Sequence, residues 1–292
     1  MSAPAESAPA PAISVVVPVR DGERTLPALL DALAAQSLDR DRFEVVVVDN
    51  ASRDRTAALA REWGARVAFE PLPNRSRARN AGVAAARAEA IAFTDADCVP
   101  EPGWLEALHD GLTRQPLLAG PVRLLHGEPP NRIERLELLW RFRQREYVDE
   151  LGWAATANVG VRREAFEAVG GFDPSYRGIG EDVDFGVRCG RAGYPIAWCA
   201  GAVVAHPIES TVSEIVRRGF RHGYASTQNR YRLGERYGRL HWRHPLPALR
   251  GDWALRRFGV EPAEHRELLR IARVEYGARV AGSAWALARR AR

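Results

Sequence analysis

Residues 13–23 read ISVVVPVRDGE, a short apolar run that ends in a cluster of charged residues. The run FEVVVV at residues 43–48 is equally apolar and rich in β-branched residues. Runs of this kind are typical of strands buried on both faces of a mainly parallel sheet. The segment between them, TLPALLDALAAQS at residues 25–37, has the apolar spacing of a helix. Together the three segments predict a strand–helix–strand unit.

The same alternation continues through the first hundred residues. A helix is expected after residue 52, capped by Ser52 or Asp54. A strand at 67–69, a helix over 78–88 and a strand over 90–94 follow. This order is that of a nucleotide-binding half-sheet. The sequence therefore predicts an α/β fold with a mainly parallel central sheet of Rossmann-like type and flanking helices.

The remainder of the chain is less regular. Residues 117–125 are predicted to form one strand, and residues 131–147 one charged helix. A further helix should begin near residue 181 and end near residue 191. From residue 210 onward the pattern is helical and rich in arginine. We therefore expect a C-terminal helical extension, with its boundary near residue 210.

Composition excludes several kinds of chemistry. All 42 basic residues counted as Lys+Arg are arginine, so Schiff bases, pyridoxal phosphate attachment and a P-loop lysine are excluded. The three cysteines have no CxxC spacing, which predicts neither a disulfide framework nor a zinc knuckle. Residues 1–12 resemble a disordered tail more than a signal peptide, and no apolar run is long enough to span a membrane. These features favour a reducing cytoplasm.

Positive charge is concentrated at the C-terminal end. Residues 214–292 hold 18 arginines against 7 acidic residues, a net charge of +11, whereas the whole chain carries +5. The charge fits a solvated helical surface or peripheral contact with anionic lipid at the inner face of a membrane. In residues 262–290 the apolar positions suit docking onto the rest of the chain equally well. Nucleic acid is not expected as a partner, because motifs and interleaved aromatic residues are missing.

Three of the predicted strands end in acid-containing clusters. The carboxyl ends of parallel strands meet at one edge of a sheet, where ligands bind. One acidic ending could be a helix cap, but three are harder to explain that way. The clusters are Arg20-Asp21-Gly22-Glu23, Asp49-Asn50-Ala51-Ser52 and Asp95-Ala96-Asp97.

The last of these clusters suggests a cation. Asp95 and Asp97 would repel each other, and a hard cation such as Mg²⁺ or Mn²⁺ would offset that repulsion and could bridge to phosphate. His206, at the end of the apolar run 203–205, is either a third ligand or an ordinary strand-end histidine. A helix cap is one alternative. A phosphohydrolase with Asp95 as nucleophile is another alternative. In such enzymes the DxD motif usually follows the first strand, and a lysine usually serves downstream.

A second acidic cluster lies at residues 178–185, GIGEDVDF. Glu181 and Asp182 would fall in the first turn of the predicted helix, where acidic residues commonly complement the helix dipole. Next to a metal site, the same residues become candidates for a general base.

Six segments, in this order, resemble the family 2 glycosyltransferases of the GT-A fold. They are VVVPVRDGE, VVVVDNASRDRT, ARNAG, IAFTDADCVPEPGWL, ANVGVRREAFEAVGGFD and GEDVDFGVRCGRAG, between residues 13 and 207. The resemblance implies inverting transfer of a sugar from a nucleotide diphosphate sugar to a hydroxyl of a glycan, a lipid-linked group or a small molecule. It also implies a catalytic domain at 13–209, divided into a nucleotide-binding half (13–100) and an acceptor-side half (101–209). Residues 1–12 would be a tail and 210–292 an Arg-rich helical extension.

The resemblance assigns the nucleotide side of the site to the strand ends and to the ARNAG segment. The residues so assigned are Pro18, Arg20, Asp21, Glu23, Asp49, Asn50, Ser52, Arg79, Asn80, Asp95 and Ala96. Glu23 is included because Arg20-Asp21 stands where many relatives have Asn-Glu. By the same resemblance Asp97 ligates the metal and Asp95 touches ribose or metal.

Asp182 would be the general base, with Glu181 as the fallback. Two other functions remain possible from the residues. One is a catalytically silent module that binds a nucleotide or carbohydrate on the same fold. The other, a sugar-phosphate nucleotidyltransferase, usually has a Gly-rich loop after its first strand, which PVRDGERT lacks.

Overall fold

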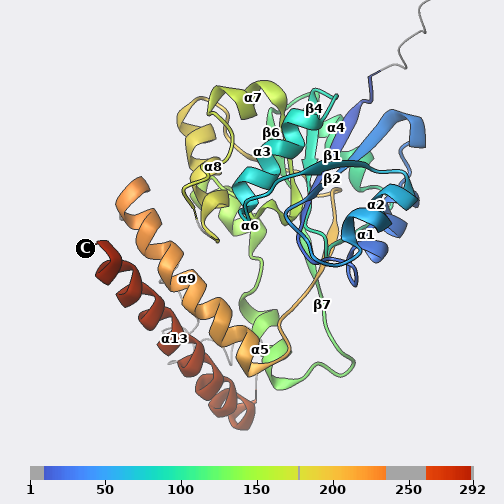
Figure 1. Cartoon of the computed structure of the whole chain (residues 1–292). Helices are drawn as coiled ribbons and strands as arrows, with labels where there is room; N and C mark the ends of the chain where they lie inside the picture. Colours follow the sequence, from blue (N-terminus) through green and yellow to red (C-terminus); the bar gives the residue numbers. More distant parts are fainter. Residues whose placement is uncertain (1–9, 177, 235–260, 291–292) are drawn as a thin grey trace, which may run out of the picture.

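The computed structural model describes residues 10–176, 178–234 and 261–290. Figure 1 shows an α/β domain with two long helices, α9 and α13, running side by side along one flank. Most of the predicted tail at 1–12 and the segment 235–260 of the predicted extension lie outside the described residues.

The predicted parallel half-sheet is confirmed. Its strands are β1 (Ile13–Val19), β2 (Phe43–Asp49), β3 (Arg66–Phe69) and β4 (Ala90–Phe93), all parallel to one another. Helices α1 (Leu26–Ala34), α2 (Thr56–Trp63) and α3 (Arg75–Ala85) connect them. A single turn of 3₁₀ helix, η1 (Arg40–Arg42), precedes β2. The sheet continues in the order β3-β2-β1-β4-β8-β6-β9.

The sheet is buried on both faces, as the continuous apolar runs require. Val15 and Val17 of β1 pack in a core that includes residues of α1, whereas Val16 packs on the other face against Ala78 and Val83 of α3. Successive side chains of a strand point to opposite faces, so a strand with helices on both sides must be apolar at every position.

Antiparallel pairs complete the domain. In the large sheet, β8 (Val159–Arg162) runs antiparallel to both β4 and β6 (Leu117–Ala119), and β9 (Ala197–Trp198) forms the edge. The small second sheet has the order β5-β10-β7, and β10 brings His206 towards the end of β4. The bounds of the remaining elements here are β5 (Val99–Pro100), α4 (Trp104–Leu112), β7 (Val122–Leu125), η3 (Thr156–Asn158), α7 (Arg163–Ala168), α8 (Glu181–Arg191) and β10 (Val204–Pro207).

Two predicted elements were wrong because the backbone breaks inside them. The predicted strand at 117–125 is two strands in different sheets, separated at Gly120, where an added Cβ would lie 1.9 Å from the carbonyl oxygen of Ala202. The predicted helix at 131–147 ends at residue 140, and Phe142 has a φ of 46°. This region consists of α5 (Arg132–Trp140), α6 (Gln144–Glu146) and the π-helical turn η2 (Tyr147–Leu151).

The two C-terminal helices are α9 (Val212–Leu233) and α13 (Pro262–Arg290). Glycines let their backbones approach closely: a Cβ added at Gly223 would lie 1.9 Å from the carbonyl oxygen of Arg279, and one at Gly282 would lie 2.0 Å from that of Phe220. The pair is joined to α5 through Arg218, whose Nη2 bonds Glu137 of α5 at 2.7 Å and Glu275 of α13 at 3.0 Å. The C-terminal helices are therefore packed onto the α/β domain.

Candidate active site

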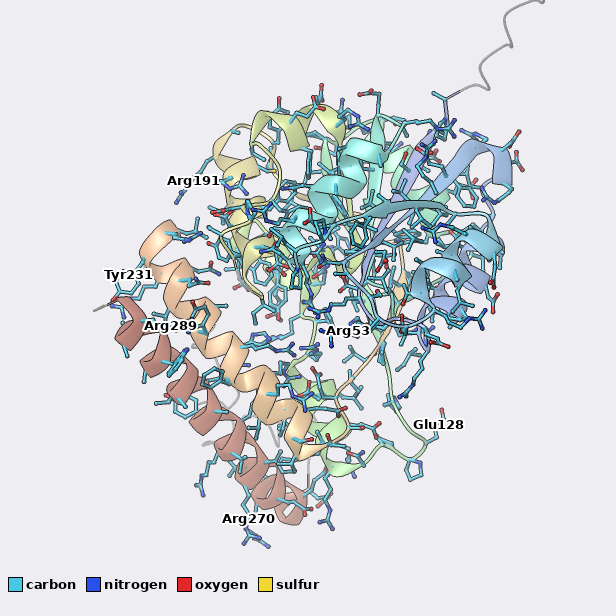
Figure 2. All side chains as sticks on the ribbon, in the orientation of Figure 1. Arg53, Glu128, Arg191, Tyr231, Arg270 and Arg289 are labelled. Atoms are coloured by element: carbon cyan, nitrogen blue, oxygen red, sulfur yellow. The ribbon has the colours of Figure 1, made fainter. Side chains whose placement is uncertain are left out.

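A cavity of about 590 Å³ opens at the carboxyl ends of β1, β2 and β4. Its opposite wall comes from the segment α5–η2 and from α9, and Figure 2 shows side chains from both sides extending into the space between them. The predicted residues that line it are Pro18, Arg20, Asp21, Asn50, Arg79, Asp95, Ala96, Asp97, Glu181, Asp182 and His206. The three strand ends therefore converge with the Glu-Asp pair of α8.

A buried arginine connects the two acidic clusters. Arg79 of α3 is 1% exposed, and it donates to Glu181 at 2.8 Å and to Asp95 at 3.1 Å. Burial disfavours its charge, but Asp95 and Glu181 outweigh that effect and raise the pKa of Arg79. Burial likewise opposes ionisation of Asp95, yet Arg79, Arg75 and His206 lower the pKa of this carboxyl. Asp95 is thus held as a carboxylate.

Asp97 and His206 form a candidate metal centre. His206 Nε2 lies 3.7 Å from Asp97 Oδ1, and these atoms lie within 4.8 Å of Cys98 Sγ. His206 Nδ1 is bonded to the backbone oxygen of Pro207, which leaves Nε2 facing Asp97. The Phe142 ring packs on the imidazole, with centroids 4.7 Å apart.

The neighbouring carboxylates of Asp95 and Asp97 place negative charge at this centre, which a bound cation would offset. Burial and the charge of Asp95 raise the pKa of Asp97, against the opposing effect of His206. Burial and the same two aspartates raise the pKa of Cys98 well above its usual value, which keeps the thiol protonated. A protonated thiol is a weak ligand, so the oxygen and nitrogen of Asp97 and His206 are the better donors.

Asp182 has a strongly altered acidity. It is half-buried at the start of α8 and lines the cavity, and burial together with the charge of Glu181 raises its pKa to about 7. Its Oδ1 accepts from the backbone N–H of Val183 at 2.8 Å. A carboxylate of this acidity can take a proton near neutral pH and remain substantially ionised.

Four predicted residues are placed outside the lining of the cavity, where they hold its walls. Ser52 accepts from the backbone N–H of Asp21 at 3.0 Å, and Glu23 accepts from that of Arg55 at 3.2 Å, so the loops after β1 and β2 are joined. Asp49 accepts from the N–H of Ser52 at 2.9 Å, within the second loop. Asn80 exchanges two hydrogen bonds with the backbone of Phe172.

Neither residue predicted to cap α2 occupies its N-cap position, which is Arg55 and has no side-chain cap. Asp54 lies one residue earlier and accepts from the Thr56 N–H at 3.0 Å. Ser52 faces the first loop instead. Asn50, which does line the cavity, also donates to the carbonyl oxygens of Glu70 and Leu72 and thereby shapes the loop before α3.

The sequence did not assign the remaining lining residues to the site. They include Arg75, Glu137, Arg141, Phe142, Tyr147, Glu209, Arg218, Arg221 and His222. Their signals in the sequence were the charged segment at 131–147 and the density of arginine after residue 210, which do not say which side chains face the strand ends.

The comparison with protein families decides the assignment. The family described as glycosyl transferase family 2 matches residues 14–170, more than half of the chain. The chain belongs to this family. As a member it is a glycosyltransferase that depends on a nucleotide sugar, in agreement with the resemblance found in the sequence.

Relatives from several organisms support the family assignment. A glycosyltransferase of Haloferax volcanii, AglE, is 29% identical over 228 residues, which cover 75% of this chain and 74% of the relative. An uncharacterized glycosyltransferase of Mycobacterium tuberculosis is 34% identical over 200 residues, 66% of this chain and 80% of its own length.

Solved structures of low sequence identity have the same GT-A fold. The mannosyltransferase PcManGT from Pyrobaculum calidifontis, in complex with GDP-Man and Mn²⁺, has a TM-score of 0.55 at 20% identity; the match covers 96% of this chain and 76% of that one. Glucosyl-3-phosphoglycerate synthase from Mycobacterium tuberculosis, in complex with Mn²⁺, UDP and its product, has a TM-score of 0.56 at 23% identity, over 75% and 79% of the two chains. The predicted GT-A fold is therefore confirmed.

Across residues 10–176, 178–234 and 261–290, every helix is too short or too polar to cross a membrane.

Proposed function

We propose that this family 2 glycosyltransferase performs a metal-dependent, inverting transfer of a sugar from a nucleotide diphosphate sugar to an acceptor hydroxyl. The observation that carries the proposal is that one cavity contains both Asp97 with His206 and the acidity-shifted Asp182. An inverting transfer needs a base on one side of the anomeric carbon and stabilisation of the departing diphosphate on the other.

The residues present fit a divalent cation, Mn²⁺ or Mg²⁺. Asp97 and His206 offer an oxygen and a nitrogen 3.7 Å apart, a separation that one ion can bridge, and Asp95 adds a second carboxylate on the same loop. When bound, such a cation would neutralise negative charge on the diphosphate. Among the solved structures, PcManGT holds GDP-Man and glucosyl-3-phosphoglycerate synthase holds UDP, so UDP- and GDP-sugars are the donors to test first.

The base that we propose is Asp182. Its Oδ1 accepts from the Val183 N–H, which leaves Oδ2 for the acceptor hydroxyl. The hydroxyl oxygen forms a bond to the anomeric carbon as its proton passes to Asp182, and the bond from that carbon to the diphosphate oxygen breaks. A covalent enzyme intermediate is not required, so configuration at the anomeric carbon inverts. Glu181 is less suited, because Arg79 engages its Oε1 at 2.8 Å.

On the nucleotide side, we propose that the loops after β1 and β2 bind the base and ribose. Pro18, Arg20, Asp21 and Asn50 reach the cavity directly. Glu23, Asp49 and Ser52 would then act by holding the two loops together, and Asn80 by fixing the turn before Phe172.

The test is sugar release from a panel of UDP- and GDP-sugars, measured with Mn²⁺, with Mg²⁺ and with EDTA. The proposal expects release from at least one donor that EDTA abolishes and added cation restores. Binding of a donor without release under any condition would instead favour the alternative of a catalytically silent nucleotide- or carbohydrate-binding module. Release of phosphate from simple phosphate esters would favour a phosphohydrolase that uses Asp95.

Peripheral membrane contact and a cytoplasmic location stay predictions. Helix α13 exposes Val274, Val280, Trp285 and Leu287, and Figure 2 shows Arg270 projecting outward from its lower part. The same helix buries Leu268, Ala272 and Ala286, which fits docking onto the domain. Flotation with anionic liposomes at low and moderate salt separates the two, because docking alone predicts no binding at either.

A further inference from the structure

The lining of the cavity contains six arginines besides Arg20 and Arg79. They are Arg75, Arg141, Arg143, Arg218, Arg221 and Arg279. Three of them have strong acidic partners. Arg218 bonds three glutamates, Arg279 lies 3.0 Å from Glu275, and Arg143 pairs with Glu146.

The other three are poorly neutralised. Within the described part of the chain, the side chains of Arg75 and Arg221 make no hydrogen bond and no ion pair. Arg141 lies 3.5 Å from Glu209 and 4.0 Å from Glu137, and its Nε is buried without a hydrogen bond. Glu137 in turn is already engaged twice by Arg218, so its charge is shared.

These three side chains are close enough to affect one another. Arg75 and Arg221 are exposed residues of the cavity lining. Partial burial comes first among the causes that lower the pKa of Arg221, the charges of Arg75 and Arg141 lower it further, and Glu209 opposes them. Burial and Arg218 likewise lower the pKa of Arg141. Cations gathered in a partly enclosed cavity repel each other, and an anionic ligand would relieve that repulsion.

The position of the cluster relates it to the acceptor. Arg75 begins α3, and its charge acts on Asp95 and Asp97 at the proposed cation site. Arg221 lies on α9, which packs against the start of α8: a Cβ added at Gly180 would meet Asn229 at 3.2 Å. Gly180 directly precedes Glu181 and Asp182. The cluster thus lies near the cation site and shares its cavity with the proposed base.

Arg221 comes from an element that is not assigned to the donor, whereas Arg75 lies on α3 with Arg79 and Asn80. Nucleotide contacts are assigned to the ends of β1, β2 and β4 and to these two residues of α3, and the cation at Asp97 and His206 would meet the diphosphate. Helix α9 lies outside residues 14–170, the part that matches the family. Acceptor choice is expected in such variable parts of a fold.

We propose that Arg75, Arg141 and Arg221 bind a phosphate group carried by the acceptor. The inference rests on the proposed function, because that function places the diphosphate of the donor at the cation site and leaves the arginine cluster for a second anion. Guanidinium groups bind phosphate oxygens through paired, charge-assisted hydrogen bonds, and three of them suit a dianion better than a carboxylate.

The experiment is calorimetry on the full chain in two stages. UDP or GDP is first titrated with Mn²⁺ present, which tests the donor site. Two phosphates are then titrated into the nucleotide-loaded protein. Glycerol phosphate has glycerol as its control. Dodecyl phosphate is kept below its critical micelle concentration and has dodecyl sulfate as its control. The variants are Arg221→Gln and Arg75→Gln, with Arg217→Gln as the matched control. Arg217 is an exposed arginine one turn away on α9 that does not line the cavity.

The proposal expects one of the phosphates to bind the loaded protein and to lose about tenfold or more in affinity in Arg221→Gln and in Arg75→Gln. Nucleotide affinity in those variants, and phosphate affinity in Arg217→Gln, should change by less than threefold. Which phosphate binds distinguishes a soluble acceptor from a lipid one.

Other outcomes would overturn the inference. If both variants lose nucleotide affinity by the same factor, the cluster serves the diphosphate of the donor. If phosphate fails to bind the loaded protein, or binds all variants equally, the acceptor site is not there. If no nucleotide binds but the variants still lose affinity for phosphate, the proposed function fails. The cluster would then be an anion site, but not a site for an acceptor.

Discussion

Arg79 Nη1 donates to Glu181 Oε1 at 2.8 Å, although 102 residues separate them in the chain. The same guanidinium donates to Asp95 at 3.1 Å. One buried cation therefore holds the end of β4, which carries the proposed metal ligands, against the start of α8, which carries the proposed base. Arg79 also opposes the rise in the pKa of Asp182, which burial and the charge of Glu181 cause.

The first prediction concerns pH. Because the pKa of Asp182 is raised to about 7 by burial and by Glu181, and because a base must be ionised to act, kcat/KM should rise with pH and level off above about 8. Below pH 6 it should fall about tenfold per unit. Glu181→Gln removes the like charge, so its midpoint should move to lower pH. A profile that is flat from pH 5 to 9 would contradict the assignment.

Substitution of the base gives the second prediction. Asp182→Asn keeps the shape of the side chain but cannot accept the proton, so turnover should fall about 10²- to 10⁴-fold. Nucleotide affinity should remain within threefold of the wild type. Asp149→Asn, an exposed change outside the cavity lining, serves as the control and should have normal turnover. Near-normal turnover in Asp182→Asn would move the role to another residue.

The third prediction concerns the buried charges that hold the C-terminal helices. Arg218 is 5% exposed and bonds Glu137, Glu209 and Glu275. Arg218→Met leaves these carboxylates without their cation and should lower the free energy of unfolding by about 3–5 kcal/mol. Arg217→Met, at an exposed neighbouring position, should change it by less than about 0.5 kcal/mol. Equal urea midpoints for the two variants would contradict this account.

The fourth prediction is that two glycine-to-alanine substitutions change the stability in opposite directions. Gly223→Ala places a Cβ 1.9 Å from the Arg279 carbonyl oxygen, so α9 and α13 must separate and stability should fall by about 1–3 kcal/mol. Gly277 has nothing within 4 Å of its added Cβ, so Gly277→Ala should raise stability by up to about 1 kcal/mol through helix propensity. Thermal unfolding of both variants measures the difference, and two shifts of the same sign would count against the close packing.

The parallel half-sheet could be predicted because local pattern and burial agree there. Residues 13–19 were predicted as a strand and are one, since an apolar run buried on both faces carries its own signal. The strand at 117–125 could not be divided from sequence, because the break at Gly120 is required by the backbone of Ala202, more than 80 residues further on.

The candidate site could be predicted on one side only. Asp95, Asp97 and Asp182 carry motifs at strand and helix ends, and they line the cavity. Arg141 and Arg221 carry no motif. They reach the cavity because the chain turns at Phe142 and because α9 packs against α8, and both are consequences of tertiary contacts.

The most direct test is calorimetric binding of UDP and GDP to the full chain with and without Mn²⁺, in the wild type, in Asp97→Asn and in His109→Ala. His109 is a histidine of α4 outside the cavity lining, so it controls for loss of a titratable side chain. We predict that one nucleotide binds at least tenfold more tightly with Mn²⁺, that Asp97→Asn abolishes this gain and that His109→Ala retains it. No binding of either nucleotide in the presence of Mn²⁺, or an undiminished gain in Asp97→Asn, would contradict the account.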